Sequence, residues 1–223
     1  MEAAFKNRSG QENLMAKYAA GSLGQGMAVL MASYVTLSSE ARQRLSNLES
    51  LHGVLLDEAE PVSVSNDMLD KLQARLDDKP DAETTSAASD ADTHGDSDIP
   101  APLRAVLGQS IDETRWRFAY PGVRQMSLPI GDRGEEVKLL KIKPGNAAPR
   151  HSHNGVEATL VLRGAFSDGK KLFERGDLAI ANEDIHHRPR AQGDEDCICL
   201  AVTDGALFFE QGVLGMVRDL FTR

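Results

Sequence analysis

An acidic, polar segment at residues 78–102 divides the chain into two stretches of different character. Asp, Glu, Ser, Thr and Pro dominate this segment, and large apolar side chains are nearly absent from it. Such a composition cannot bury enough apolar surface to offset the entropy lost on ordering, so we expect a linker with a solvated His94. The sequence therefore predicts two domains, at residues 1–77 and 103–223.

Residues 1–77 carry the three- and four-residue apolar spacing of amphipathic helices. One apolar stripe runs through residues 37–55, and an earlier helix is expected over residues 13–20. A later helix is expected over residues 65–76, with Ser65 as its N-cap. A helical bundle of this size is marginal alone and benefits from a partner or a staple.

After residue 102 the apolar spacing changes to a period of two. Short alternating segments lie at residues 137–143, 157–162 and 197–202, and Gly and Pro punctuate the chain between them. Several short strands at this spacing predict a small β-barrel or sandwich. The tail, residues 206–221, returns to a helix-like pattern; we expect it to pack on the barrel, with a partner-binding surface as the alternative.

Charge and hydropathy narrow the class of protein. The formal net charge is −9, and the basic residues are scattered, which argues against direct nucleic-acid binding. No stretch approaches the 18 apolar residues of a membrane span, and the first residues lack the pattern of a signal peptide. We therefore expect a cytoplasmic protein without membrane contact.

Two cysteines, Cys197 and Cys199, lie in one alternating segment. On a strand both thiols point to the same face, roughly 6.6–6.8 Å apart along the chain. A disulfide needs Cβ atoms about 3.8 Å apart, so we expect free thiols, as in a reducing compartment. Two interpretations stay open: small buried side chains on a strand, or redox-sensing thiols.

Two histidines and a glutamate are spaced so that they can converge. His151 and His153 project to one face of an extended strand, because side chains alternate with period two. A turn at residues 154–155 then returns the chain, so that Glu157 can point at the same place. Burying these groups together is costly without a cation between them, whereas a divalent ion makes them an ordinary ligand set.

The spacing Gly145-x5-His151-x-His153-x3-Glu157-x6-Gly164 resembles the first motif of the cupin family at every position. The second motif, laid on Gly176, selects His187 rather than His186 as the fourth ligand, although Asn182, Asp184 and Ala191 replace its Pro, Gly and Asn. The resemblance implies a β-barrel of the double-stranded β-helix, jelly-roll type. We expect one divalent metal per chain, with zinc, iron, manganese and nickel all open by ligand type.

Over nearly its full length the chain resembles ChrR-type anti-sigma factors of the zinc-binding anti-sigma superfamily. The likeness lies in Tyr18-Ala-Ala-Gly-Ser-Leu, the helical stripe from Arg42 to Leu56, the acidic linker, His187-Arg-Pro, and Gly193 to Asp204. It implies a helical half that holds an extracytoplasmic-function sigma factor inactive. It also implies a zinc-binding cupin half that makes release responsive to singlet oxygen or organic hydroperoxides.

One departure from that family concerns its second zinc site, in the helical half. The family's His-x3-Cys-x2-Cys is replaced here by Tyr34, Ser38 and Ala41, and none of these can supply an imidazole or a thiolate. We therefore expect no N-terminal zinc. Either these residues fill the space of the metal and sigma binding is kept, or the helices serve another partner or a homodimer.

Three functions are consistent with these residues, and the first is the one predicted. It is a regulator, not an enzyme: an anti-sigma factor whose amphipathic helices mask a sigma factor. The second is a cupin metalloenzyme, an oxygenase or isomerase with an appended helical domain. The third is a stand-alone metal-dependent sensor whose helical domain no longer binds sigma.

Overall fold

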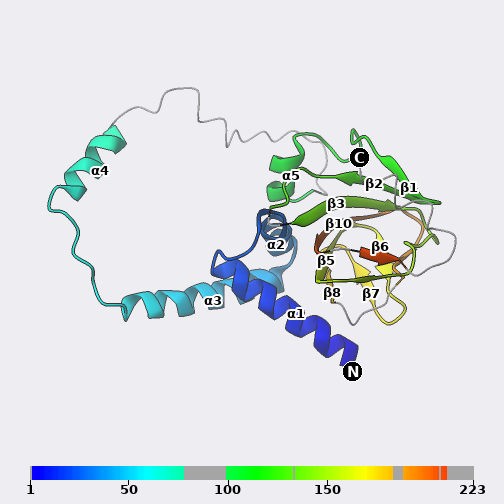
Figure 1. Ribbon diagram of the computed structural model, residues 1–223, viewed down its shortest axis with the longest axis horizontal. Coiled ribbons are helices and arrows are strands. Elements are labelled where there is room, and N and C mark those ends of the chain that lie inside the picture. Colours follow the sequence, from blue (N-terminus) through cyan, green and yellow to red (C-terminus); the bar gives the residue numbers. More distant parts are fainter. Residues whose placement is uncertain (1, 78–98, 133, 183–187, 206, 210–223) are drawn as a thin grey trace. The chain divides into compact units, whose positions relative to one another are not determined.

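A computed structural model describes the chain except for residues 1, 78–98, 133, 183–187, 206 and 210–223 (Figure 1). Most of the predicted linker, with His94, lies outside the described residues, as do His186 and His187. The described chain resumes before the predicted end of the linker at residue 102, because Ile99 is buried and a helix begins at Ala101.

Five helices are described: α1 Glu2–Ala19, α2 Gln25–Leu37, α3 Ser39–Asp57, α4 Met68–Asp77 and α5 Ala101–Leu107. The helices expected near residues 13–20, 37–55 and 65–76 are present as α1, α3 and α4, with α1 extending further toward the N-terminus. The sequence analysis missed α2 and α5. The α2 helix is apolar on more than one side, so it lacks the single stripe by which amphipathic helices are found.

The strands after residue 116 form three antiparallel sheets. The six-stranded sheet has the order β1-β2-β3-β10-β5-β8, the three-stranded sheet β7-β6-β9, and the two-stranded sheet β11-β4. Their bounds are β1 Arg117–Tyr120, β2 Val123–Ser127, β3 Glu135–Ile142, β4 His151–His153, β5 Val156–Arg163, β6 Ala165–Ser167, β7 Leu172–Glu174, β8 Leu178–Ala181, β9 Arg190–Gln192, β10 Cys197–Asp204 and β11 Leu207–Phe209.

This architecture confirms the predicted helical half and jelly-roll fold, with two corrections. The described strands pair as separate sheets facing each other and do not close into a hydrogen-bonded barrel. The helix expected over the tail is also wrong where the tail is described, because Leu207–Phe209 pairs with His151–His153 as a strand. Its remaining residues, 210–221, lie outside the described part of the chain.

The chain forms two compact units. One unit contains residues 1–49 and 96–223, and the other contains residues 50–95. Helices α1 and α2 and the first part of α3 therefore belong to the same unit as the sheets. The predicted boundaries at residues 77 and 102 stay a prediction.

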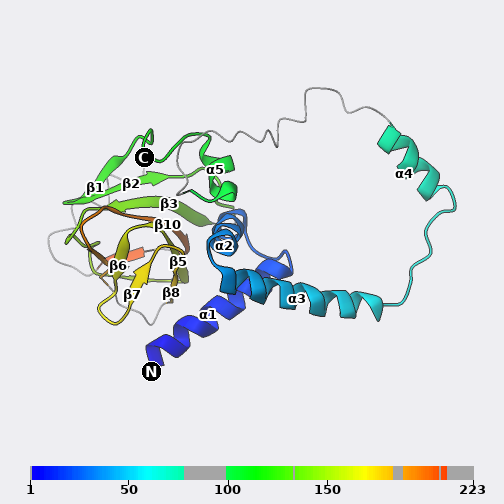
Figure 2. The same cartoon turned by 180° about the vertical axis from the view of Figure 1, so that it is seen from behind.

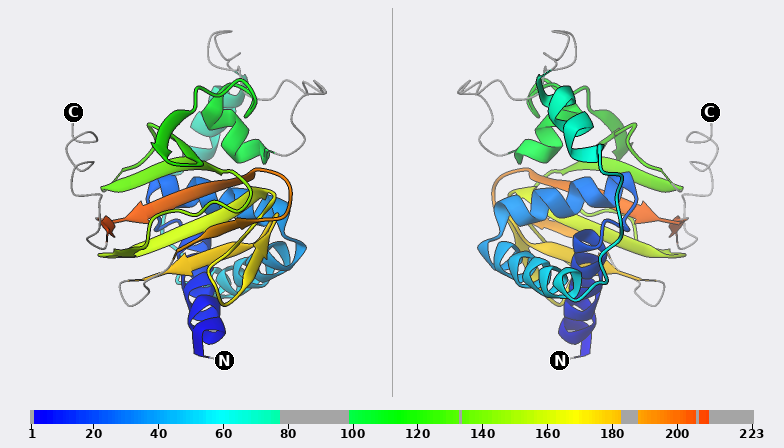
Figure 3. Two further views of the ribbon diagram at one scale, coloured as in Figure 1. Left: turned by 90° about the vertical axis from the view of Figure 1, so that its right-hand side faces the viewer. Right: turned by 90° about the vertical axis from the view of Figure 1, so that its left-hand side faces the viewer.

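The three central strands of the six-stranded sheet, β3, β5 and β10, have packing partners on both faces. On one face Leu139, Leu160 and Leu200 belong to a core shared with the helices. On the other face Ile142, Val161 and Cys199 belong to a second core, between the sheets. Figure 3 shows α2 lying across one face of the sheet, with β6 and β7 on the opposite side.

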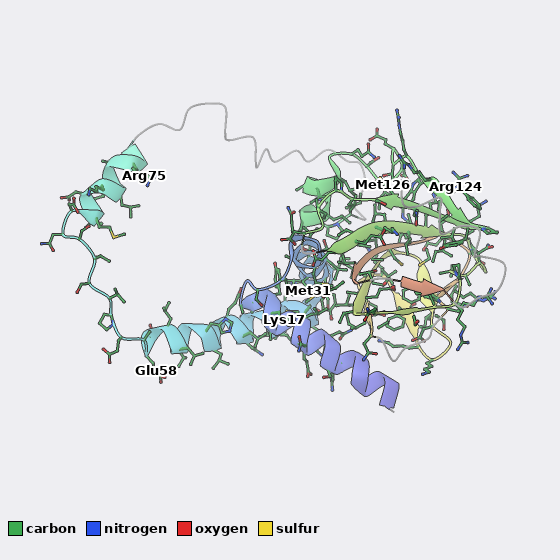
Figure 4. The ribbon with its side chains drawn as sticks, viewed as in Figure 1. Lys17, Met31, Glu58, Arg75, Arg124 and Met126 are labelled. Carbon is green, nitrogen blue, oxygen red and sulfur yellow. The ribbon has the colours of Figure 1, made fainter. Side chains whose placement is uncertain are left out.

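Helices α1 and α2 contribute directly to the first of these cores. Met27, Leu30 and Met31 of α2 are at most 4% exposed and belong to that core; Met31 is labelled in Figure 4 where the helices meet the sheet. The α1 helix covers the edge strand β8 (Figure 2), and the side-chain amide of Gln11 donates a hydrogen bond to the carbonyl of Leu178. The helices are thus part of the cupin-like unit's own hydrophobic core.

Candidate metal centre

Two glycines allow the connections on either side of the candidate site to cross with their backbones in close contact. Gly155, between β4 and β5, has φ 135°, and Gly205, between β10 and β11, has φ 123°. A Cβ atom on Gly155 would lie 1.7 Å from the carbonyl oxygen of Asp204, and one on Gly205 would lie 1.8 Å from that of Asn154. Only glycine satisfies both the backbone angles and this close crossing. The crossing fixes the short strand β4 beside β11.

His151 on β4 and Glu157 on β5 face each other inside the fold. His151 is 6% exposed and Glu157 is 9% exposed, and their Nε2 and Oε2 atoms are 3.5 Å apart. The Nδ1 atom of His151 lies 2.7 Å from the carbonyl oxygen of Pro149. Because a carbonyl can only accept, Nδ1 carries a proton, so Nε2 is the nitrogen that faces Glu157: it donates to the carboxylate when the ring is protonated and has a free lone pair when the ring is neutral.

Thr159, two residues along β5, fixes the carboxylate. Its hydroxyl donates a hydrogen bond of 3.0 Å to Oε1 of Glu157, while Oε2 is directed toward the imidazole. Burial lowers the pKa of His151, but the hydrogen bond and negative charge of Glu157 outweigh burial and leave this pKa above its ordinary value. The pair is therefore held by mutual charge in a site largely closed to water.

These two side chains have the donor chemistry of a divalent metal site. Nε2 of one and Oε2 of the other converge, and each is oriented through its other polar atom by Pro149 or Thr159, the usual outer support of metal ligands. His153 lies on β4 opposite Leu207, but its side chain is outside what the structure describes, and so is all of His187. Among described side chains, no group of three or more potential ligands is assembled. The four-ligand set stays a prediction.

A cavity of about 90 Å³ opens beside this pair. Its lining includes His151, Glu157, Thr159, Thr203 and Cys199, and most of the other lining residues are apolar, with Gln125, Glu136 and Lys138 as polar exceptions. The other lining residues are Ala119, Tyr120, Val123, Gln125, Glu136, Lys138, Leu140, Ile142, Ala148, Pro149, Phe166, Pro189 and Ala201. One thiol therefore shares a small cavity with the candidate metal ligands.

Cys197 and Cys199 are free thiols, as the sequence predicts. Both are buried, at 0% and 1% exposed, on the face of β10 between the sheets, and their sulfur atoms are 3.5 Å apart. The hydrogen bond with Cys197, burial, and the negative charge of Glu157 raise the pKa of Cys199 well above its ordinary value. Cys199 is therefore a protonated thiol at neutral pH.

Burial and protonation should make both thiols slow to react in the folded chain. We expect alkylation by iodoacetamide at pH 7.5 to be at least about a hundredfold slower for the native protein than for protein in guanidinium chloride, where both thiols react. Mass spectrometry of the alkylated chain over time measures both rates. Rapid modification of Cys199 in the native state would show that the cavity admits reagents freely.

The positions of the family's N-terminal zinc ligands are filled by packing and hydrogen bonds. Tyr34 and Ala41 are 6% and 0% exposed and belong to the core shared with the sheet. The Ser38 side chain accepts a hydrogen bond from the backbone N–H of Ala41 and hydrogen-bonds Tyr34. Burial raises the pKa of Tyr34 despite that hydrogen bond. The α2–α3 junction is therefore closed by these three side chains.

Residues 50–95 present a different kind of surface. Nine large apolar side chains of this unit are more than half exposed: Leu51, Val54, Leu55, Leu56, Val62, Val64, Met68, Leu69 and Leu72. In the described remainder of the chain only Phe118 and Leu172 are large, apolar and exposed. Exposed apolar surface on this scale marks an interaction site more often than a solvated face.

Sequence reasoning missed the supporting residues of the metal centre. The position of Thr159, two residues after Glu157 on an alternating segment, could have predicted a hydroxyl on the same face. Pro149 gave no signal, because it acts through its carbonyl. The cavity depends on pairing between β3, β5 and β10, which spacing along the chain does not reveal.

A jelly-roll whose interior brings an imidazole and a carboxylate together beside a small cavity defines a cupin-type domain. A family model described as the ChrR cupin-like domain matches residues 105–207. The chain is 38% identical to the anti-sigma-E factor ChrR of Cereibacter sphaeroides over 209 residues, covering 93% of this chain and 94% of that protein.

The likeness extends to three-dimensional structure. A chain in the solved complex of Rhodobacter sphaeroides SigE with the anti-sigma ChrR matches with a TM-score of 0.74 and 37% identity, covering 86% of this chain and 96% of that one. The protein belongs to the ChrR family of anti-sigma factors. Membership places it among regulatory proteins rather than enzymes, as the sequence predicts. No helix in the described residues is long and apolar enough to cross a membrane.

Proposed function

We propose that this protein is a cytoplasmic anti-sigma factor that binds and inhibits an extracytoplasmic-function sigma factor. The observation that carries the proposal is the exposed apolar surface of the described residues between Leu51 and Leu72. A unit with so many exposed large side chains gains stability when a partner covers them. The relative of known structure was solved together with SigE, which supports a sigma factor as that partner.

The α4 helix has the form of a docking helix. Met68, Leu69 and Leu72 are spaced to lie on one side of it and are 53–63% exposed, and an ion pair joins Asp67, the residue before the helix, to Lys71 in its first turn. An amphipathic helix binds by laying its apolar side into a groove of the partner. The positions of the missing N-terminal zinc ligands, Tyr34, Ser38 and Ala41, belong to the other compact unit and are not part of this surface.

A paired substitution tests this surface. Changing Leu69 and Leu72 to Asp should weaken sigma binding by about a hundredfold or more, because buried apolar anchors dominate interface energies. The sigma factor is first obtained by affinity capture with the intact wild-type chain, and its affinity for each variant is then measured by calorimetry.

The control introduces an aspartate in place of an exposed apolar side chain of the other compact unit. Phe118→Asp changes a side chain that is 70% exposed on β1, in the other compact unit, and should leave sigma affinity within about threefold of wild type. Failure of the wild-type chain to capture any sigma factor, or equal binding by the Leu69/Leu72 variant, would contradict the proposal.

The cupin half is proposed as the part that senses oxidative stress, from singlet oxygen or organic hydroperoxides. His151, His153, Glu157 and His187 would hold one divalent metal, most simply zinc, which as a Lewis acid fixes its ligands and favours deprotonated donors nearby. The burial of His151 and Glu157 and their supporting hydrogen bonds favour this assignment. Cys199, in the same cavity, and Cys197 beside it are the proposed oxidation targets for an oxidant that has entered the cavity, since both thiols are buried and unreactive from outside it.

A further inference from the structure

The N-terminus of helix α2 is bound by two carboxylates from the β2–β3 connection and strand β3. Asp132 accepts a hydrogen bond of 2.6 Å from the backbone N–H of Gln25. Glu135 accepts one of 2.8 Å from Gly26 and one of 3.3 Å from Met27. The first N–H groups of a helix have no partner within the helix, and its dipole favours negative charge there, so this contact joins complementary groups.

Glycines make room for this contact. A Cβ atom on Gly24 would lie 2.5 Å from a carboxylate oxygen of Glu135 and 2.7 Å from one of Asp132. A Cβ atom on Gly26 would lie 2.4 Å from a methyl carbon of Val137 and 2.9 Å from Glu135. Glycine within a helix normally lowers the stability of the helix. Its presence at position 26 indicates that close approach to β3 is worth more than this loss of helix stability.

Strand β3 faces α2 on one side and the cavity on the other. Glu135 and Val137 contact the start of α2, whereas Glu136, Lys138 and Leu140, which alternate with them, line the cavity. β3 is also the direct neighbour of β10, where Leu140 pairs with Cys199. The same strand carries Glu135, so a displacement of β3 at the cavity also moves the carboxylate that binds the start of α2.

We propose that Asp132 and Glu135 are positioning residues that couple the cupin cavity to helix α2. They fix the start of α2 on strand β3, and α3 follows α2 after a single residue, Ser38. A change in the cavity thus reaches the helical half through β3 and these carboxylates. The inference deepens the proposed sensing function and rests on it, but its test uses no sigma factor and no metal.

Hydrogen–deuterium exchange of the full-length chain tests the contact itself. In a variant with Asp132→Ala and Glu135→Ala, amides at the start of α2 should exchange about tenfold faster, because their charged acceptors are gone. Asp132→Asn with Glu135→Gln keeps neutral acceptors and should give an intermediate rate. The charge-matched control, Asp194→Ala with Glu195→Ala in an exposed turn, should leave α2 unchanged.

Two glycine substitutions give an independent test. Gly26→Ala should speed exchange in α2 despite the better helix propensity of alanine, because the new methyl group meets Val137 and Glu135. Gly53→Ala in α3, where a Cβ meets nothing within 4 Å, should slow local exchange or leave it unchanged. Unchanged exchange in both the carboxylate variant and the Gly26 variant, with β5 and β10 protected as in wild type, would overturn the proposal.

A double-mutant cycle tests the coupling. Leu140→Ala enlarges the cavity and should speed exchange at the start of α2 by about fivefold in the wild-type background. The same substitution should have no further effect on α2 once Asp132 and Glu135 are alanine. Equal effects in the two backgrounds, or no effect on α2 in either, would show that the carboxylates do not transmit the state of the cavity.

Discussion

Replacing Leu30 by alanine is expected to destabilise the cupin-type domain by about 2–5 kcal/mol, although Leu30 lies on helix α2. Leu30 is fully buried in the core that α2 shares with the six-stranded sheet, so the substitution removes apolar contacts on both sides of that core. The single tryptophan, Trp116, packs against the same core beside β1. Its fluorescence during denaturation in guanidinium chloride therefore measures the effect.

A matched leucine provides the control. Leu56 is 75% exposed in the unit of residues 50–95, and Leu56→Ala should change the free energy of unfolding by less than about 0.5 kcal/mol. Leu30→Ala could instead leave the midpoint of the Trp116 fluorescence transition unchanged and lower only the midpoint of a separate unfolding transition of the helices. The helices and the sheets would then unfold independently. The shared core described above would then be wrong.

The second large effect is expected at the candidate metal centre. His151→Ala or Glu157→Ala should weaken metal binding by more than about a hundredfold, because each removes a donor atom from a buried site. Purified wild-type protein should contain about one metal ion per chain, since Tyr34, Ser38 and Ala41 cannot form the N-terminal site. Elemental analysis gives the stoichiometry, and competition with a chelating dye gives the affinity.

Two further variants separate ligands from their neighbours. Thr159→Val removes only the hydroxyl that orients Glu157, so we expect a smaller loss of affinity, about 10-fold to 100-fold. His186→Ala should retain the metal, because the motif spacing selects His187. Two metal ions per chain, or full binding by the His151 variant, would contradict the assignment.

The spacing of residues along the sequence predicted the part of the site that comes from two consecutive strands. The approach of His151 to Glu157 follows from period-two alternation and a glycine turn, both visible in the sequence. Strands β3, β5 and β10 were found close to their predicted positions for the same reason. These features depend on residues that lie near one another along the chain.

Features that depend on distant contacts were not predictable in this way. The α2 helix was missed because it is covered by both the sheet and neighbouring helices, which removes its amphipathic stripe. Asp132 and Glu135 resemble ordinary surface acids until α2, more than 100 residues earlier, is placed against them. The strand at Leu207–Phe209 was mistaken for helix because its pairing with β4 outweighs local propensity.

The two-faced burial of β3, β5 and β10 has a consequence for how such proteins diverge. A helix taken from one relative and joined to the sheet of another brings together surfaces that did not evolve against each other, so residues 1–49 and 96–223 should be inherited as one piece. Residues 50–95 lie between them as an insertion and carry the surface proposed for the partner. Recombination confined to that insertion would exchange the proposed partner surface while the cupin-type domain and its helices stay matched.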